Sequence, residues 1–210
     1  MKILIADDHA VVRRGLRQIL AEEFKTLAAC EAQNAQEALS LVREQEDWDI
    51  VVLDISMPGK SGLEVLKELK QLRPQVPVLI LTAHPEEQYA LRVLKAGAAG
   101  YMTKESAPEH LIEAVRKVVG GERYISSTLR ELLADSLSGD MEKPPHENLS
   151  DREYQVLRLI ASGQTVGQIA DKLSLSVKTV STYRARILEK MGMKTNSALM
   201  HYFILNKLDF

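Results

Sequence analysis

The feature that most constrains the fold is an alternation of short apolar runs with longer amphipathic segments across residues 1–119. The short runs are bounded by charged or turn-forming residues, a pattern typical of buried strands. The longer segments repeat apolar residues at helical spacing. Five strands that alternate with five helices predict a parallel sheet with helices on both faces and right-handed crossovers. The expected strands are residues 3–6, 26–29, 50–53, 78–81 and 98–102.

Each expected helix of this first unit carries one apolar stripe that can pack on the sheet. The stripes are Val12, Leu16, Ile19 and Leu20; Ala35, Ala38, Leu39 and Val42; Leu63, Leu66, Leu69 and Leu72; Tyr89, Val93 and Leu94; and Leu111, Val115 and Val118. Pro74 marks a loop between two of the elements. The unit is expected to end near Gly120 and Gly121.

Residues 120–148 break the alternation. Adjacent prolines, Pro144 and Pro145, exclude a helix interior and favour an extended spacer. We therefore expect a flexible linker at about residues 138–148, with the usual uncertainty at its ends. One short apolar-periodic stretch precedes it, at Leu129, Leu132, Leu133 and Leu137.

From Ser150 onward the pattern is helical only. Ser150 and Glu153 fit a capping box at the start of the first helix of this region. Gly163 and Gly192 are helix-ending signals, and a fourth helix is expected from about residue 196 to 206. The apolar faces of the first three helices are Tyr154, Leu157, Ile160 and Ala161; Val166, Ile169, Ala170 and Leu173; and Val177, Val180, Ile187 and Met191.

The composition is that of an ordinary globular protein, with 45% hydrophobic and 27% charged residues in a chain of 210. The single cysteine, Cys30, excludes an internal disulfide, and no Cys/His cluster has zinc-finger spacing. The apolar run near the N-terminus is too short for a signal peptide or a membrane span, so we expect a cytoplasmic protein with no membrane partner. The net charge of −2 hides an acidic excess in residues 1–149 and a basic excess in residues 150–210. This asymmetry favours two units, the second of them near a polyanion.

Polar side chains follow the expected strands, at the sheet edge where open parallel sheets bind ligands. Asp7 and Asp8 follow the first strand, Asp54 follows the third, Thr82 ends the fourth, and Lys104 lies just past the fifth. Three carboxylates in one cleft repel one another, and Mg²⁺ suits a site of few carboxylates, waters and phosphate. A carboxylate can also attack a phosphoryl group, whose oxygens Lys104 and Mg²⁺ would neutralise. Taken singly, Asp8 could be a helix N-cap, Asp54 a loop carboxylate and Lys104 a solvated lysine.

Over residues 1–120 these positions resemble the receiver domain of two-component response regulators, which implies a flavodoxin-like α/β fold. The matching motifs are Asp7-Asp8, Asp54-Ile55-Ser56-Met57-Pro58 followed by Gly62, Thr82-Ala83, and Tyr101-Met102-Thr103-Lys104. The resemblance implies that Asp54 accepts a phosphoryl group from a sensor histidine kinase. It also implies that Asp7 or Asp8, Asp54 and the backbone carbonyl of Ser56 hold Mg²⁺.

The resemblance assigns further roles near the acidic residues. It implies that Thr82 bonds the acyl phosphate, that Lys104 pairs with it, and that Tyr101 turns inward on activation. Many receivers carry proline after this lysine, often with a cis peptide, whereas this chain has Glu105. His84 lies two residues past Thr82, where side chains can influence the attack of water on the acyl phosphate. A solvated loop histidine is the alternative for His84.

Residues 165–190 predict a helix, a short turn and a second helix, a pair that can lay its second helix in a DNA major groove. Small polar residues beside cations suit base edges and phosphates. The outward residues are Lys178, Ser181, Thr182 and Ala185, with Arg186 nearby and Arg184 and Lys190 flanking them. A solvated amphipathic face is the alternative, and the turn at residues 173–175 lacks the frequent glycine.

Residues 148–210 resemble the LuxR-type helix-turn-helix domain of NarL/FixJ regulators. The matching positions are Leu149-Ser150-Asp151-Arg152-Glu153, Val156-Leu157, Gly163, Ile169-Ala170, Leu173, Ser176, Lys178-Thr179-Val180, Ile187 and Lys190-Met191. The match adds Thr179 to the candidate DNA-binding residues. Ser181 and Tyr183 stand where the family often has lysine and histidine, so its sequence preference cannot be transferred. The resemblance implies that the last helix, around residues 198–205, helps DNA-bound dimers form.

The sequence therefore predicts a response regulator transcription factor, not an enzyme. Its predicted parts are a receiver domain at 1–120, a linker with a short helix at 121–147 and a small all-α, four-helix helix-turn-helix domain at 148–210. Phosphorylation of Asp54 would favour a homodimer that binds double-stranded DNA, with RNA polymerase as a further candidate partner.

Two rival functions stay open on the sequence alone. A haloacid-dehalogenase-like phosphatase also uses a strand-end aspartate as nucleophile, but it would want an acidic residue where Ser56 stands. A regulator that binds DNA without phosphate control would not need the full set of acidic, hydroxyl and lysine side chains. A measured response to a phosphodonor separates these possibilities.

Overall fold

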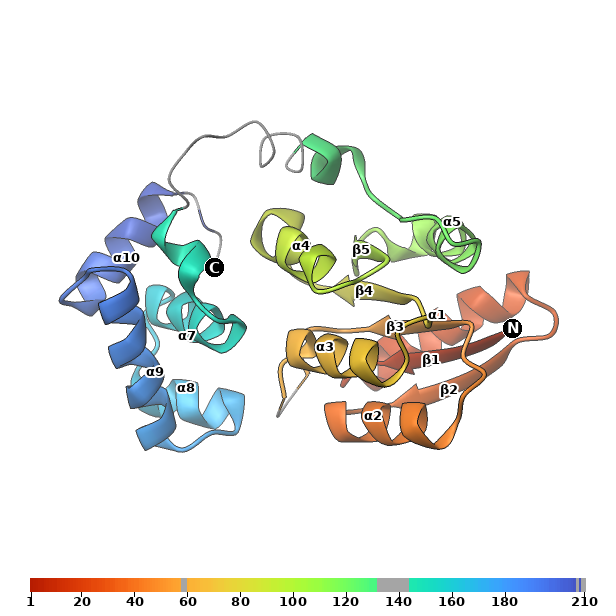
Figure 1. Cartoon of the computed structure of the whole chain (residues 1–210), viewed down its shortest axis with the longest axis horizontal. Helices are drawn as coiled ribbons and strands as arrows, with labels where there is room; N and C mark the ends of the chain where they lie inside the picture. The colour runs from red at the N-terminus through yellow and green to blue at the C-terminus, as the bar shows by residue number, and fades with distance from the viewer. Residues whose placement is uncertain (58–59, 132–143, 207, 209–210) are drawn as a thin grey trace. The chain divides into compact units, whose positions relative to one another are not determined.

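The computed structural model describes residues 1–57, 60–131, 144–206 and 208, which fall into two compact units (Figure 1). The first unit runs to residue 137 and the second begins at residue 138. The domain limits expected from the sequence stay predictions. Part of the predicted linker, including Leu132, Leu133 and Leu137, lies outside the described residues.

The first unit is a five-stranded parallel sheet with alternating helices, as the sequence predicted. The strands lie in the order β2-β1-β3-β4-β5. Every neighbouring pair is parallel. The elements are β1 Lys2–Ala6, α1 Ala10–Glu23, β2 Ala28–Ala32, α2 Ala35–Glu44, β3 Ile50–Leu53, α3 Gly62–Leu72, β4 Val78–Thr82, α4 Glu86–Lys95, β5 Gly100–Thr103 and α5 Ala107–Val119.

Two strands begin later than the apolar runs suggested. β2 begins at Ala28 instead of residue 26, because Leu27 N–H donates to Phe24 O in the turn after α1. β5 begins at Gly100 instead of residue 98, because Ala98 N–H donates to a carbonyl of α4. In both places, hydrogen bonds to the preceding helix or turn override the apolar pattern at the strand start.

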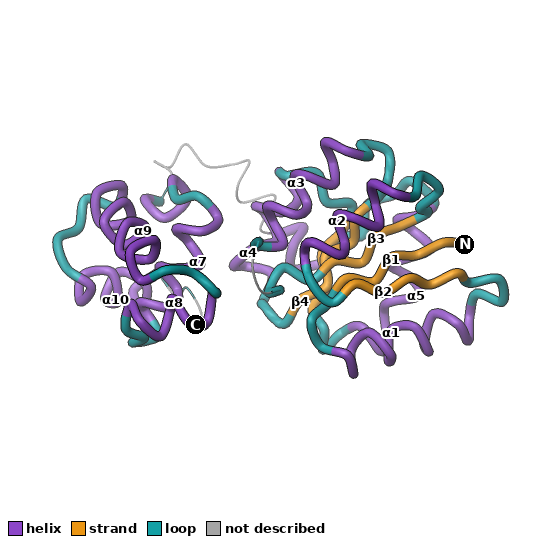
Figure 2. The backbone as a smooth tube through the Cα atoms, turned by 90° about the horizontal axis from the view of Figure 1, so that it is seen from below, coloured by secondary structure: helices purple, strands orange, loops and turns teal. Residues whose placement is uncertain are grey.

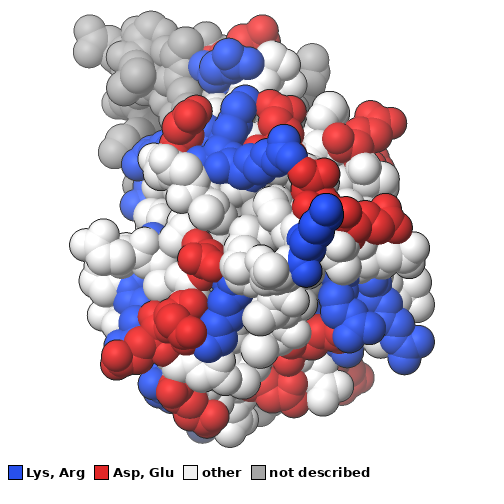
Figure 3. Space-filling model, turned by 90° about the vertical axis from the view of Figure 1, so that its right-hand side faces the viewer, with Lys and Arg blue, Asp and Glu red and all other residues white. Residues whose placement is uncertain are grey.

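Helices cover both faces of the sheet, with α1 and α5 on one side and α2 and α3 on the other (Figure 2). The α1–α5 side holds a continuous aliphatic core of buried residues from every layer: Ile3, Ile5, Ile50, Val52, Leu79 and Leu81 from strands, and Leu16, Leu20, Leu111 and Val115 from helices. On the side of this unit shown in Figure 3, acidic and basic side chains are interspersed instead of forming a patch of one sign.

The second unit is helical, as predicted. Its elements are the 3₁₀ turn η1 Pro145–Asn148 and the helices α7 Asp151–Ala161, α8 Val166–Leu173, α9 Val177–Lys190 and α10 Asn196–Leu205. The predicted capping box is present at the start of α7, and α7 packs against α9 and α10. The turn between α8 and α9 places Ser174 in the left-handed region (φ 54°), which explains how this turn forms without a glycine.

One residue of the predicted inner faces is placed differently. Val177 is 57% exposed, whereas Val180 and Ile187 of the same helix are buried. Val177 is the first residue of α9, so its side chain projects beyond the part of the helix that the neighbouring helices cover. Among the described residues, no helix is both long and apolar enough to cross a membrane.

Candidate functional site

The ends of four strands bring the predicted pocket residues to one edge of the sheet. Asp7 directly follows β1, Asp54 follows β3, Thr82 is the last residue of β4, and Lys104 follows β5. β1 neighbours β3 and β4 neighbours β5, all in parallel orientation. The carboxyl ends of these strands therefore meet, which is why residues up to about a hundred positions apart share one pocket.

A lysine lies between two buried carboxylates in this pocket. Asp7 and Asp54 are 2% and 1% exposed. Lys104 Nζ lies 2.7 Å from Asp7 Oδ2 and 2.7 Å from Asp54 Oδ2. Because a buried carboxylate without a partner is costly, Lys104 compensates charge that the fold has removed from water. Lys104 is thus part of the pocket and not a solvated surface lysine.

The pocket shifts the pKa of both kinds of group. Burial raises the pKa of the Asp54 carboxyl above its ordinary value, although Lys104 and the Ser56 N–H oppose the shift. Burial acts to lower the pKa of Lys104, but its contacts with Asp54 and Asp7 outweigh this and raise it. Lys104 therefore stays cationic at neutral pH, and Asp54 is a more basic oxygen nucleophile than an exposed aspartate.

The loop after β3 is shaped around Asp54. Ser56 N–H donates to Asp54 Oδ1 over 3.0 Å. A Cβ at position 62 would lie 2.2 Å from Ile55 Cα and 2.6 Å from the Asp54 carbonyl oxygen. Only glycine fits this close backbone approach, which gives the Gly62 of the predicted motif a physical role.

The β4–α4 loop links the pocket to a buried tyrosine. Tyr101 is fully buried, and its hydroxyl donates to His84 O at 2.8 Å and Pro85 O at 3.2 Å. The tyrosine is therefore in the inward position. Thr82 is also fully buried, and His84 Nε2 lies 2.8 Å from Ser56 Oγ. His84 is thus half-buried and in contact with the Asp54 loop.

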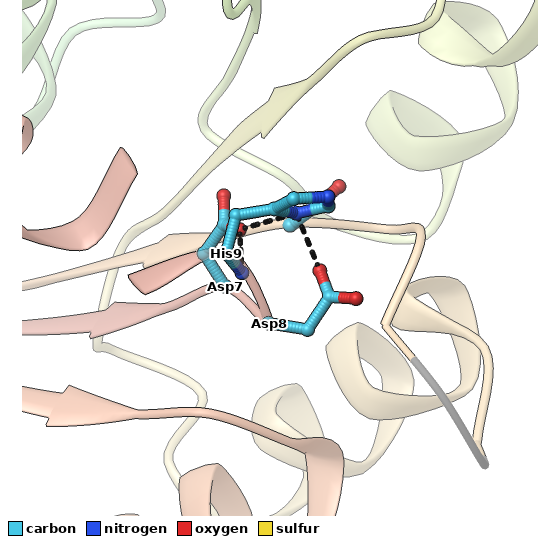
Figure 4. Close-up of side chains that lie close together, drawn as sticks. Asp7, Asp8 and His9 are labelled. Carbon is cyan, nitrogen blue, oxygen red and sulfur yellow. Dashed lines mark hydrogen bonds and ion pairs between the residues drawn. The ribbon is translucent and has the colours of Figure 1, made fainter. Parts of the chain in front are cut away.

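A group of potential metal ligands lies beside Asp54. Ligand atoms of Asp7, Asp8, His9 and Asp54 all lie within 4.8 Å of one another. Asp7 Oδ2 and Asp8 Oδ1 are buried and accept no hydrogen bond, although Lys104 Nζ lies 2.7 Å from the first and His9 Nδ1 lies 2.8 Å from the second. Clustered carboxylate oxygens with unused lone pairs fit a hard divalent cation. Figure 4 shows the His9 ring turned toward the carboxylates of Asp7 and Asp8.

Sequence reasoning missed two residues of this site. His9 was not singled out, although its place directly after Asp7 and Asp8 was a signal. Arg13, one turn into α1, donates from Nη1 to the Asp7 carbonyl oxygen at 2.7 Å and from Nε to Glu31 at 3.1 Å. It fixes the backbone that carries Asp7, and no local pattern pointed to it.

The candidate DNA-binding residues lie on α9 in the second unit, and they fall into two groups. Lys178, Ser181, Thr182 and Arg186 are exposed, and so is Lys190, which also belongs to the second group. Three make contacts that hold the unit together: Thr179 Oγ1 with Ser176 Oγ at 2.7 Å, Arg184 Nε with Asn196 Oδ1 at 2.6 Å, and Lys190 Nζ with Glu153 Oε2 at 2.6 Å. Lys190 and Arg184 couple the α9 surface to the starts of α7 and α10, whereas Thr179 contacts the N-cap of α9 itself.

Two family models match the chain. The response regulator receiver domain matches residues 3–116, and the bacterial regulatory proteins of the luxR family match residues 147–203. Response regulator GacA of Pseudomonas aeruginosa is 38% identical over 200 residues, which are 95% of this chain and 93% of that protein. Response regulator UvrY of Escherichia coli K12 is 35% identical over 209 residues, which are 99% of this chain and 95% of that protein.

Solved structures of RcsB resemble the whole chain. RcsB from Salmonella enterica serovar Typhimurium, bound to promoter rprA in the presence of the phosphomimetic BeF3⁻, has a TM-score of 0.64 at 28% identity, covering 97% of this chain and 98% of that one. A structure of the RcsB–DNA complex has a TM-score of 0.59 at 28% identity, covering 99% of this chain and 98% of that one.

Proposed function

Because the chain belongs to the two-component response regulators that carry a LuxR-type DNA-binding domain, the NarL/FixJ family, we propose that it is a phosphorylation-controlled transcription factor. Members of this family are DNA-binding regulators, not enzymes, which excludes the alternative of a haloacid-dehalogenase-like phosphatase. In the proposal, Asp54 accepts a phosphoryl group from a sensor histidine kinase. Phosphorylation then promotes a dimer that binds double-stranded DNA and acts on RNA polymerase in the cytoplasm.

The observation that carries the proposal is that the buried carboxylate of Asp54 forms an ion pair with Lys104. A carboxylate oxygen of Asp54 attacks the phosphorus of a phosphohistidine, forming the O–P bond of an acyl phosphate while the N–P bond to the histidine breaks. The electron pair of that bond leaves with the imidazole. Lys104 holds its charge at the place where negative charge on the phosphoryl oxygens must be balanced.

A divalent cation fits the oxygens of Asp7, Asp8 and Asp54, and we propose Mg²⁺ with the Ser56 carbonyl as a further ligand. When bound, such a cation neutralises the phosphoryl oxygens during in-line transfer. Asp7 contacts two other side chains of the pocket, because Oδ2 faces Lys104 and Oδ1 faces His9. Lys104 and the cation thus share the acidic residues without competing for every oxygen.

In this proposal, phosphorylation of Asp54 changes the rest of the receiver domain through the β4–α4 loop. Thr82 stands at the pocket edge, where its hydroxyl can bond a phosphoryl oxygen. Tyr101 is bonded to the carbonyls of His84 and Pro85 in the same loop. A switch of about 100-fold in DNA affinity requires only about 2.7 kcal/mol of differential stabilisation, which a few charge-assisted contacts can supply.

The α9 surface is the proposed DNA interface. Lys178, Ser181, Thr182 and Arg186 are exposed along one helix, with small polar groups for base edges and cations for phosphates. The structures named above hold RcsB on DNA, in one of them on promoter rprA, and this chain resembles that protein along nearly its whole length. Thr179, Arg184 and Lys190 complete the proposed surface from positions that also brace the domain.

The test is sedimentation velocity together with DNA binding, with and without Mg²⁺ and beryllofluoride, a phosphoryl mimic. We expect the mimic to drive dimerisation and tighten DNA binding in the wild type. We expect neither effect in Asp54→Asn, which should also lose labelling by a small-molecule phosphodonor. Equal dimerisation and DNA binding without the mimic would instead establish a constitutive DNA binder.

A further inference from the structure

His9 is the one nitrogen donor within the cluster of potential metal ligands in the described pocket. We propose that His9 is a ligand of the divalent cation in the receiver pocket and shifts its selectivity from Mg²⁺ toward first-row transition ions such as Mn²⁺. The inference rests on the proposed function, because it concerns the same cation. It adds a ligand and a metal preference that the carboxylates alone do not imply.

The spacing of the donor atoms supports coordination by His9. His9 Nδ1 lies 2.8 Å from Asp8 Oδ1 and 3.1 Å from Asp7 Oδ1. In an octahedral site with ligands about 2.1 Å from the ion, adjacent donors lie about 3.0 Å apart and opposite donors about 4.2 Å apart. The two His9 distances therefore have the size of octahedral edges. The whole cluster spans 4.8 Å, so a small inward adjustment would bring every donor into range.

The lysine and the histidine use different oxygens of the acidic residues. Lys104 Nζ faces the Oδ2 atoms of Asp7 and Asp54, whereas His9 faces the Oδ1 atoms of Asp7 and Asp8. Asp8 Oδ1 is buried and accepts no hydrogen bond although His9 Nδ1 is near. A cation can therefore enter on the His9 side while Lys104 keeps its own contacts. This leaves the arrangement needed for phosphoryl transfer intact.

The His9 ring lies against the cluster, where Nδ1 is at hydrogen-bond distance from Asp7 Oδ1. His9 is the N-cap of α1, a position where a side chain usually accepts a bond from the helix N-terminus, but its ring makes no capping bond. Its backbone N–H instead donates to Asp7 Oδ1 at 2.8 Å. This bond fixes the His9 backbone beside Asp7, and the ring contacts the carboxylates of Asp7 and Asp8, as Figure 4 shows. Once Nδ1 binds an ion, the neutral ring carries its proton on Nε2.

The chemistry of the donor gives the direction of selectivity. Mg²⁺ prefers oxygen ligands and gives up water reluctantly, whereas an imidazole nitrogen strengthens binding of first-row transition ions. A site of oxygens plus one imidazole therefore gains more for Mn²⁺ than for Mg²⁺. The competing arrangement is one in which the incoming cation displaces the ring. Removing the ring would then strengthen binding of both ions.

The experiment uses the full chain, with Mn²⁺ and Mg²⁺ as probes. Pulsed electron paramagnetic resonance of bound Mn²⁺ should reveal coupling to a directly bound ¹⁴N in the wild type. His9→Gln should abolish this coupling and weaken Mn²⁺ binding about tenfold in calorimetric titration, with a much smaller change for Mg²⁺. The matched control is His110→Gln, which removes an exposed histidine of α5 and should change neither measurement.

The outcomes are distinguishable. Bound Mn²⁺ without nitrogen coupling, coupling that persists in His9→Gln, or tighter binding by His9→Gln would each overturn the role of His9 while leaving the cation of the proposed function in place. If neither ion binds the wild type, both the cation site and the role of His9 are overturned. Asp54→Asn, which removes a carboxylate of the cluster, should weaken both ions and so locates the bound ion in this pocket.

Discussion

The receiver pocket and the α9 surface are built in opposite ways. The pocket collects buried charges from the ends of four strands, so its residues meet only because the sheet orders them. The α9 surface is a single run of 14 residues whose polar side chains are mostly exposed. Buried charges and close packing give large energies, whereas exposed charges are screened. Substitutions should therefore act strongly in the first region and gently in the second.

The largest effect is expected where packing leaves no room. Gly62→Ala would place a Cβ against the backbone of Ile55 and Asp54, so we expect it to lower the free energy of unfolding of the first unit by about 3 kcal/mol. Urea unfolding followed by fluorescence reports on this unit, because Trp48 is the single tryptophan and is buried there.

The control for this prediction is a second glycine of the same unit. Gly15 of α1 has nothing within 4 Å of an added Cβ, so Gly15→Ala should stabilise the first unit by about 0.5–1 kcal/mol. Similar losses in both variants would show that the close approach at Gly62 does not determine the stability of the pocket loop.

The next effect concerns the buried charges. Lys104→Met leaves Asp7 and Asp54 buried without their cation, and we expect a loss of about 2 kcal/mol of unfolding free energy at neutral pH. A carboxyl whose folded-state pKa is raised favours the folded state below its unfolded pKa and loses that advantage as pH rises through the folded value. The defect should therefore shrink in acidic solution, and the same tryptophan signal can follow it.

A matched lysine on the surface tests whether burial is the cause. Lys117 forms an exposed pair with Glu113 one helical turn away, so Lys117→Met should leave the unfolding midpoint unchanged. If Lys104→Met were equally harmless, or if its defect grew toward acidic pH, the pairing of Lys104 with Asp7 and Asp54 would not be what stabilises the pocket.

The same contrast explains what sequence reasoning reached. The alternation of apolar runs and amphipathic segments predicted the parallel sheet. Because these strands are parallel, their ends alone bring Asp7, Asp54, Thr82 and Lys104 to one edge of the sheet. Motif matching added Gly62, but only the structure supplied its reason, the approach to the Ile55 backbone. Strand order and strand direction fix which residues meet in the pocket, and the sequence pattern predicts both.

Other features depend on contacts that no local pattern encodes. The late starts of β2 and β5 follow from hydrogen bonds to the preceding turn or helix, and the exposure of Val177 follows from where its neighbours end. His9 and Arg13 act through the geometry of the first turn of α1, which composition and periodicity do not show. Arg184 is a proposed DNA contact that also braces the domain, and the sequence could not show the second role because it depends on where Asn196 lies in the fold.

A smaller effect is expected in the second unit, where one ion pair is half sheltered. Glu153 closes the capping box of α7 and contacts Lys190. Burial acts to raise the pKa of Glu153, but the contacts with Lys190 and Ser150 outweigh it and lower the pKa from the ordinary 4.5. Its stabilisation is therefore present above that value and lost as pH falls through the lowered pKa.

Glu153→Gln isolates the charge, because glutamine can still close a capping box. We expect a loss of about 1 kcal/mol at neutral pH that disappears in strongly acidic solution, followed by circular dichroism of the second unit's transition. Glu189→Gln, at an exposed position of α9, is the control and should show no such pH dependence. A defect that is constant across pH would mean that shape and not charge accounts for the role of Glu153.

The smallest effect separates DNA contact from bracing on α9. Arg186 is exposed, whereas Arg184 donates to Asn196 of α10 over 2.6 Å. Arg186→Ala should weaken DNA binding by about 0.5–1 kcal/mol and reduce the magnitude of the salt-dependence slope by about 1, with the unfolding of the second unit unchanged. Arg184→Ala should lower both DNA affinity and stability, because it also removes the link to α10. Anisotropy of labelled DNA across a salt series, with beryllofluoride present, measures the first effect, and circular dichroism measures the second. If Arg186→Ala left the slope unchanged while Arg184→Ala reduced it without destabilising the unit, the phosphate contact would belong to the residue that we assign to bracing.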